Sequence, residues 1–204
     1  MTARTRTPLW LATTIVALFA ASTASATTMV YRSIDELTTM SDAVVRVTVL
    51  NSRTYWTDET MKTEWEVRVD EVFRGEAPAT LTIRQLGGEL DGYSVHIPGD
   101  ARFSEGESAV VFLVERDGMY FLTAMGQAKM SLSVIDPPVT STQTPVFDGE
   151  VIPLNAVAIR DLSDIAFYRV VDGQSEFFGM TEPEIISLDE LRSMGSRADQ
   201  ESQR

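Results

Sequence analysis

The chain of 204 residues contains no cysteine and a single histidine, His96. Without thiols there are no disulfide bonds, no thiolate nucleophiles and no thiolate metal ligands. One histidine cannot supply the imidazoles on which most zinc sites depend. We therefore expect neither a structural metal nor any other cofactor.

Sequence motifs of common catalytic sites are also missing. The chain has no Gly-x-Ser-x-Gly elbow, no phosphate-binding loop, no His-Glu-x-x-His and no calcium loop. The two lysines, Lys62 and Lys129, do not stand in a Ser-x-x-Lys setting. We therefore predict that the protein is not an enzyme and has no catalytic residues.

The loop around His96 leaves two chemical alternatives open. The carboxylates of Glu89, Asp91 and Asp100 are candidates for a hydrolase, although acidic pairs arise by chance in so acidic a chain. His96 with Glu89 and Asp91 would be a mixed metal site, but an ordinary loop histidine is the simpler interpretation.

The first residues have the pattern of an export signal. Arg4 and Arg6 precede an apolar run over residues 9–21, and Ala24 and Ala26 are the small residues that a signal peptidase requires. The run is shorter than the roughly 20 residues that span a bilayer, which favours cleavage over an uncleaved anchor.

We therefore expect residues 1–26 to be a cleaved signal peptide and the mature chain to begin near Thr27. No cysteine follows the apolar run, so no lipid anchor is expected. The predicted location is the periplasm or the medium, and no membrane span is expected after cleavage.

Acidic residues outnumber basic ones by 30 to 17, and loss of Arg4 and Arg6 would take the formal net charge from −13 to −15. Nucleic acid is a poor partner for such a surface, because phosphate binding requires clustered basic residues. The negative charge favours solubility, with selection of a basic partner as the alternative.

Two short helices are predicted near the ends of the mature chain. Ser33 and Glu36 form a capping box for a helix over about residues 33–41. Ser187 and Glu190 begin a second helix, which Gly195 is expected to end. Residues 196–204 are predicted to be a disordered tail.

Between the helices the apolar period changes from 3.6 to 2, which indicates strands. Residues 63–72 and 79–85 alternate apolar and polar side chains, whereas residues 108–115 are apolar on both faces and should form the most buried strand. Asp117-Gly118 is typical of a type I′ hairpin turn.

The pattern predicts a mainly β protein: a small antiparallel OB-like β-barrel bracketed by two short helices, with an additional C-terminal hairpin. The barrel domain is assigned to residues 27–135. A Pro/Thr-rich arm or linker follows at 136–150, and the C-terminal hairpin and helix pack on the barrel from 151 to 195. Asp172-Gly173 should turn that hairpin, which either joins the barrel or packs outside it.

Aromatic residues gather around an acidic hairpin tip at residues 57–62. Tyr55, Trp56 and Trp65 are candidate partner-binding residues, because aromatic side chains beside loops often anchor interfaces. The alternatives are that Trp65 belongs to the core and that Tyr55 and Trp56 close the end of the barrel.

A glycine-rich loop over residues 85–100 supplies the remaining candidates, Gly87, Gly88 and His96. Glycines permit a partner to approach the backbone closely, but they are equally typical of a long connection.

The segments DEVFRGE, ARFSEGESAVVFL and GQAK, with the Gly-Gly loop between the first two, resemble a group of secreted bacterial proteins. The resemblance covers about residues 31–135 and the closing ISLDELRSM segment. The resemblance implies an OB-type barrel related to netrin-like modules, the class to which the tissue inhibitors of metalloproteinases belong. The group is also similar to products encoded beside matrixin-type proteases.

Tissue inhibitors bind the protease zinc through an amino-terminal cysteine, which this chain lacks, so no site residue carries over. We expect a non-catalytic exported interaction module whose partner is another extracytoplasmic protein, such as a metalloprotease. The alternative is a carbohydrate or cell-surface binding domain, in which the same aromatic residues stack on sugar rings.

Overall fold

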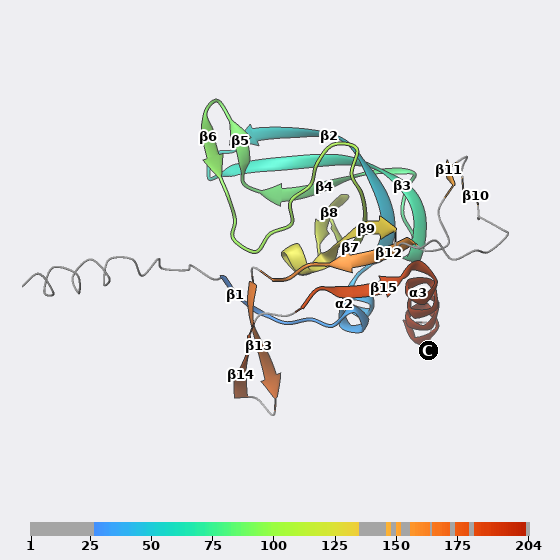
Figure 1. Cartoon of the computed structure of the whole chain (residues 1–204). Coiled ribbons are helices and arrows are strands. Elements are labelled where there is room, and N and C mark those ends of the chain that lie inside the picture. Colours follow the sequence, from blue (N-terminus) through green and yellow to red (C-terminus); the bar gives the residue numbers. More distant parts are fainter. Residues whose placement is uncertain are drawn as a thin grey trace, which may run out of the picture.

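The computed structural model describes residues 27–134, 146–147, 150–151, 156–163, 165–171, 174–179 and 182–202 (Figure 1). The predicted signal peptide and the Asp172-Gly173 turn lie outside these ranges. Of the predicted arm at 136–150, only two short paired strands, β10 and the start of β11, are described.

The described secondary structure consists of strands, two α-helices and one short 3-10 helix. In chain order the elements are β1 (Thr27–Val30), α2 (Ile34–Met40), β2 (Ala43–Trp56), β3 (Met61–Gly75), β4 (Thr80–Leu86), β5 (Gly88–Leu90), β6 (Tyr93–Val95), β7 (Ser108–Arg116), β8 (Met119–Leu122), η1 (Met125–Ala128), β9 (Lys129–Val134), β10 (Val146–Phe147), β11 (Glu150–Val151), β12 (Ala156–Arg160), β13 (Ile165–Val171), β14 (Gln174–Gly179), β15 (Glu184–Ser187) and α3 (Leu188–Ser202).

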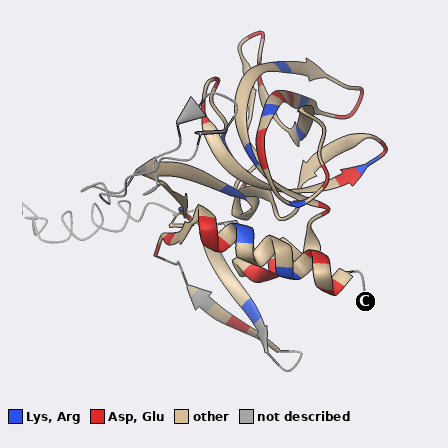
Figure 2. Ribbon diagram, turned by 90° about the vertical axis from the view of Figure 1, so that its right-hand side faces the viewer, with Lys and Arg blue, Asp and Glu red and all other residues tan. Residues whose placement is uncertain are grey.

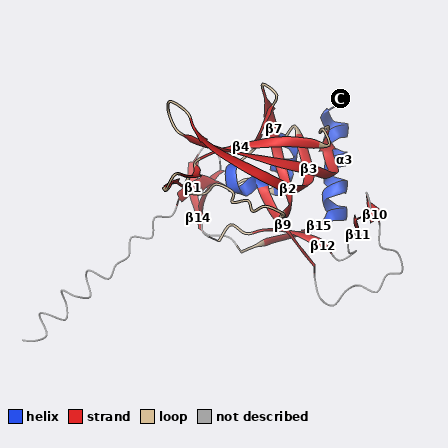
Figure 3. Cartoon of the chain, turned by 90° about the horizontal axis from the view of Figure 1, so that it is seen from above, coloured by secondary structure: helices blue, strands red, loops and turns tan. Residues whose placement is uncertain are grey.

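Five strands close into a barrel in the order β2–β3–β4–β8–β7, with β7 pairing back to β2. Four of the five pairings are antiparallel, and a short parallel contact between Ile83 and Tyr120 joins β4 to β8. The strands cross one another in the view from above (Figure 3). The predicted mainly β, OB-like barrel is therefore confirmed.

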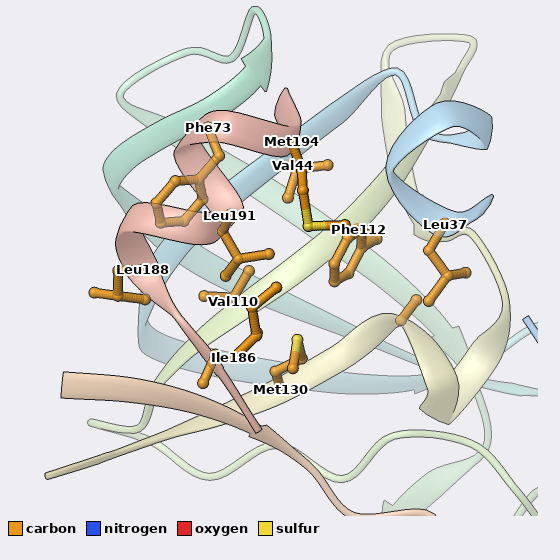
Figure 4. Packing of buried hydrophobic residues seen from close by; sticks show 12 residues of the cluster. Leu37, Val44, Phe73, Val110, Phe112, Met130, Ile186, Leu188, Leu191 and Met194 are labelled. Atoms are coloured by element: carbon orange, nitrogen blue, oxygen red, sulfur yellow. The ribbon is translucent and has the colours of Figure 1, made fainter. Parts of the chain in front are cut away.

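Strand β7 lies between two hydrophobic cores. Val110 and Phe112 belong to the core beneath the helices, whereas Val111 and Leu113 face the barrel interior, and all four are fully buried. Burial of both faces explains why residues 109–114 are all apolar, as predicted from the sequence. Figure 4 shows Phe112 among the side chains of the helix-side core.

The β7–β8 hairpin has the predicted turn. Asp117 and Gly118 both have positive φ, 53° and 74°, and they link Arg116 to Met119, which pair across the hairpin. Positive φ at both central residues defines a type I′ turn.

The first helix, α2, begins with the predicted capping box. The Ser33 side chain accepts a hydrogen bond from the Glu36 amide, and the Glu36 carboxylate accepts one from the Ser33 amide. These two bonds satisfy backbone donors that the first turn leaves free. Leu37 points from α2 into the helix-side core (Figure 4).

The last helix extends beyond its predicted end. Ser187 caps it as expected, but α3 continues through Gly195 to Ser202, so the prediction of a disordered tail from residue 196 is wrong for residues 196–202. Gly195 serves packing instead: a Cβ there would lie 1.9 Å from the Phe73 carbonyl oxygen. Glycine lets α3 lie directly against β3 (Figure 3).

Acidic and basic residues both lie along α3 (Figure 2). Two of them reach β3, where Arg192 Nε lies 2.6 Å from Glu71 Oε1 and Arg74 Nε lies 3.6 Å from Asp199 Oδ1. The helix is thus held to the sheet by ion pairs as well as by apolar packing.

The C-terminal strands divide between two sheets. β9, β12 and β15 extend the barrel sheet beyond β7, whereas β13 and β14 pair with β1 in a separate three-stranded sheet that projects away from the barrel (Figure 1). The predicted C-terminal hairpin therefore lies outside the barrel. It is completed by β1, which runs parallel to β13.

A buried arginine connects β12 and β15 to the segment between β1 and α2. Arg160 is fully buried on β12 and forms an ion pair with Glu184 on β15. Its Nη1 donates to the carbonyl oxygen of Arg32 at 2.9 Å, and the Tyr31 hydroxyl also bonds to Glu184. The segment between β1 and α2 is thereby fixed to the extended sheet.

None of the described helices is long and apolar enough to cross a membrane.

We predict that Gly195→Ala destabilises the protein by about 1–3 kcal/mol, because the new methyl group collides with the β3 backbone. In an ordinary helix interior the same change stabilises by roughly 0.5–1 kcal/mol. Urea denaturation measures the difference. Ser196→Ala, at an exposed position of α3, is the matched control and should change the unfolding free energy little. A stabilised Gly195→Ala variant would contradict the packing of α3 on β3.

Candidate functional site

An open cleft of about 700 Å³ lies where the ends of β2, β3 and β4 meet the β5–β6 hairpin. Thr54, Thr63 and Trp65 line it from the barrel strands, and the loop over residues 96–103 supplies the facing wall. Its size is in the range of small-ligand sites. Four of the six predicted binding residues, Trp65, Gly87, Gly88 and His96, line this cleft.

An aromatic pair forms one part of the lining. The Trp65 and Phe103 rings lie 5.6 Å apart at an angle of 47°, and both pack against the barrel core. Trp65 is thus half-buried core and cleft lining at once. Its indole Nε1 is buried and has no hydrogen-bond partner within the described residues.

The two neighbouring glycines allow β5 to cross closely over the barrel strands. A Cβ on Gly88 would lie 2.2 Å from Thr63 Oγ1 and 2.7 Å from Thr54 Cγ2, and a Cβ on Gly87 would lie 2.3 Å from the Val95 carbonyl oxygen. Both residues also have positive φ, 85° for Gly87 and 136° for Gly88. Internal packing therefore accounts for these glycines, and contact of their backbone with a partner remains a prediction.

His96 is exposed at the edge of the cleft, where its Nε2 lies 3.3 Å from Arg102 Nη2. Nearby, Asp100 Oδ1 accepts a hydrogen bond from the Ala101 amide at 2.8 Å. Burial raises the pKa of the Asp100 carboxyl, with the bonds from Ala101 and Gln85 opposing the shift. A carboxylate in this position is costly unless something compensates it.

Of the three acidic residues in the two chemical alternatives, two line the cleft and one does not. Glu89 and Asp100 line the cleft, whereas Asp91 has a φ of 52° in the turn of the β5–β6 hairpin. Across the described part of the chain, no three His, Cys, Asp or Glu side chains are grouped to hold a metal ion.

Two exposed aromatic residues stand at the tips of neighbouring hairpins. Trp56 ends β2 and is 50% exposed, and Tyr93 begins β6 and is 66% exposed. Their ring centroids lie 6.2 Å apart in an edge-to-face arrangement. We call this pair the aromatic rim. It adjoins the cleft, because Trp56 shares a face of β2 with the cleft residue Thr54 and the Tyr93 ring packs against Trp56.

Tyr55 points to the opposite face of β2, as the alternation of side chains along a strand requires. Its hydroxyl donates to Glu64 Oε1 at 2.9 Å. Arg84 and Arg53 bind the same carboxylate at 2.7 and 2.8 Å. Tyr55 and Trp56, grouped together by sequence, therefore cannot contact one partner through a single flat surface.

The arginines determine the ionisation of Glu64. Hydrogen bonds from Arg84 first, and from Arg53 and Tyr55 as well, lower the pKa of the Glu64 carboxyl from its ordinary 4.5 to about 2. The hydrogen-bonded cluster fixes the outer face of the hairpin that carries Trp56.

Two residues of this region, Tyr93 and Phe103, were not predicted from the sequence. Tyr93 directly follows Asp91-Gly92, a dipeptide that indicates a hairpin turn, so a signal was present. Phe103 lies in an irregular loop, where no periodicity shows which way a side chain points.

Neither models of known protein families nor curated proteins match this sequence. What the site does is therefore inferred from its own residues.

We predict that Glu64→Gln lowers stability by about 1 kcal/mol near neutral pH, a modest value because Arg53 is largely exposed. The folded pKa lies below the unfolded one, so the charge stabilises above about pH 4.5, and this contribution is lost as the pH falls toward 2. The difference in unfolding free energy between wild type and variant should shrink over that window.

Denaturation at a series of pH values measures this difference. Tyr55→Phe is the control, because it keeps both arginines on Glu64 and should retain most of the pH dependence. A difference that stays constant down to the lowest pH would show that the ion-pair cluster does not stabilise the fold.

Proposed function

We propose that the protein is an exported, non-catalytic interaction module that binds another extracytoplasmic protein with the end of its barrel. The binding surface would be the aromatic rim, Trp56 and Tyr93, together with the adjoining cleft. One observation carries the proposal: the rim presents two large, mutually packed aromatic side chains to solvent at the tips of neighbouring hairpins.

Aromatic residues contribute disproportionately to protein interfaces, because they bury large areas at a small cost in conformational entropy. The two rim side chains are held against each other before any partner binds. Such preorganisation reduces the entropy that binding must overcome.

The finer proposal is that the partner is a metalloprotease which the module binds or regulates. It rests on the resemblance to secreted proteins with netrin-like barrels, and the OB-like strand order is compatible with it. Since the chain has no cysteine, any inhibition would not use a thiolate on the protease zinc. The rim, rather than the amino terminus, would make the contact.

A specific observation also favours the alternative, a carbohydrate or cell-surface binding domain. The cleft combines the Trp65 and Phe103 rings with the hydroxyl groups of Ser52, Thr54 and Ser94. Aromatic faces beside neutral hydrogen-bonding groups suit a ligand rich in hydroxyls. In this alternative the ligand occupies the cleft itself, and the rim only borders it.

Export is part of the proposal, and intact mass measurement of the protein from its native source tests it. We expect a mature chain beginning near Thr27, found in the periplasm or the medium. That residue opens β1, which pairs with β13, so cleavage after residue 26 would leave the described fold intact. A full-length chain that stays in the cytoplasm would refute export.

Affinity capture from the native periplasm and culture medium tests the binding surface. We predict that the mature chain retains a protein and that Trp56→Ala combined with Tyr93→Ala reduces its recovery at least about tenfold, as expected for two central aromatic contacts. Mass spectrometry identifies the retained protein and reveals whether it is a protease.

Phe177→Ala is the matched control, because Phe177 is an equally exposed aromatic residue, 67%, on β14 of the separate sheet. If capture survives the double change but is lost with Phe177→Ala, the binding surface lies on the β1–β13–β14 sheet, and the proposed surface is wrong. If no protein is retained and glycan-array binding depends on Trp65, the carbohydrate alternative replaces the proposal.

A further inference from the structure

Among the described residues, strand β2 has partner strands on both edges along its first half and on one edge along its second half. Residues 43–48 lie between β3 and β7. The last bonds on the β7 side join Val49 to Glu107 and Gly106, at 2.9 and 2.8 Å. From Asn51 to Trp56, β3 is the only strand that pairs with β2 within the described residues. In Figure 1 this half of β2 runs along the upper margin of the barrel toward the β5–β6 hairpin.

The turn at the end of the hairpin determines which backbone groups face this edge. The Thr57 amide donates to the Thr60 carbonyl at 2.8 Å, so these two residues form a hydrogen-bonded pair. Bonded and non-bonded pairs alternate along an antiparallel ladder. Tyr55 and Arg53 therefore bond to β3 through their backbones.

The alternate residues, Ser52, Thr54 and Trp56, direct their N–H and C=O groups to the open side. Their register partners on β3 agree with this, because the Met61 carbonyl, opposite Trp56, accepts from the Gly87 amide on the far side of β3. Within the described part of the chain, no backbone hydrogen bond uses the open edge between residues 51 and 56.

The usual protection of an edge strand is weak here. Natural edges are blocked by prolines, several charges or a covering segment. Residues 51–56 contain no proline and one charged side chain, Arg53, which is 73% exposed. The edge also continues the candidate site, because Ser52 and Thr54 line the cleft and Trp56 belongs to the aromatic rim.

We propose that the open edge of β2, residues 51–56, binds an extended peptide segment of the partner as an additional strand. Inward side chains of that peptide would be apolar and would contact Trp56 and Tyr93. Outward side chains beside Arg53 would be acidic. The inference rests on the proposed function and specifies how the partner is held.

A second copy of the chain fits this edge less well than a partner peptide. Two chains, each with a formal net charge of −13, repel one another. Antiparallel pairing of two β2 edges about Thr54 would also place the two Arg53 side chains on the same face as near neighbours.

The test uses the mature chain and random linear peptides displayed on phage. Selected peptides are synthesised, and their affinities for wild type and variants are measured by fluorescence anisotropy. We expect peptides that alternate apolar and acidic residues. Ser52→Pro should bind them at least about tenfold more weakly, because proline removes an edge N–H and its ring obstructs pairing.

Two controls separate the loss of the Ser52 N–H from other effects of the substitution. Ser52→Val keeps the N–H and should lose much less affinity than Ser52→Pro. Glu105→Pro introduces proline at an exposed turn position and should leave binding unchanged. The hydrogen bond of this turn runs from the Glu107 amide to the Ser104 carbonyl, so it does not need the Glu105 N–H that proline removes. Should Ser52→Pro fail to fold, amide-proton NMR of the wild type must show peptide-induced shifts at residues 52, 54 and 56.

The inference is overturned if no peptide is selected, if Ser52→Pro binds as wild type does, or if the shifts centre on another strand. A dimer that Ser52→Pro dissociates would assign the edge to a second copy and also overturn it. If natural partner capture survives Ser52→Pro but is lost with Trp56→Ala, the edge inference fails while the proposed function stands.

Discussion

Strand β7 is the element on which both cores depend, because it pairs with three strands while its two faces serve different interiors. One edge pairs with β2, and the other is shared between β9 at residues 109–111 and β8 at residues 113–116. Where the second edge changes partner, the sheet divides into a closed barrel and an extension that carries β12 and β15. Every side chain from Ala109 to Leu113 is buried as a result, so a polar residue here would disrupt one core or the other.

This division places the helices and the candidate site at different parts of the molecule. α2 and α3 cover the helix-side core, and Arg160 fixes the segment before α2 to the extension. Neither described α-helix covers the far ends of β2, β3 and β4, where the β5–β6 hairpin lies instead (Figure 1). The cleft is at this end of the barrel. Exposed aromatic side chains and an incompletely paired strand occur together at this end. Binding surfaces are often built in this way, from exposed residues on loops that a rigid scaffold of strands and helices holds in position.

Local sequence signals predicted most of the fold. The capping box at Ser33, the turn at Asp117-Gly118 and the apolar run of β7 each specify a local geometry, and the structure has all three. The end of α3 was mispredicted because a glycine that stops a helix and a glycine that permits close packing look the same in sequence. In the candidate site, Trp65 and His96 were predicted from two separate segments and line the same cleft, whereas Tyr55 was grouped with Trp56 despite facing the other way. The partners of these side chains are distant in sequence, so spacing alone does not reveal them.

The central claim is that the helix-free end of the barrel binds a partner protein. Hydrogen–deuterium exchange of the mature chain, with and without the captured partner, tests it most directly, because it reports every backbone segment at once. The account predicts slower exchange in residues 52–56 and 88–96 and little change in α3 or the β13–β14 hairpin. Protection confined to α3 or to the β1–β13–β14 sheet would contradict the claim.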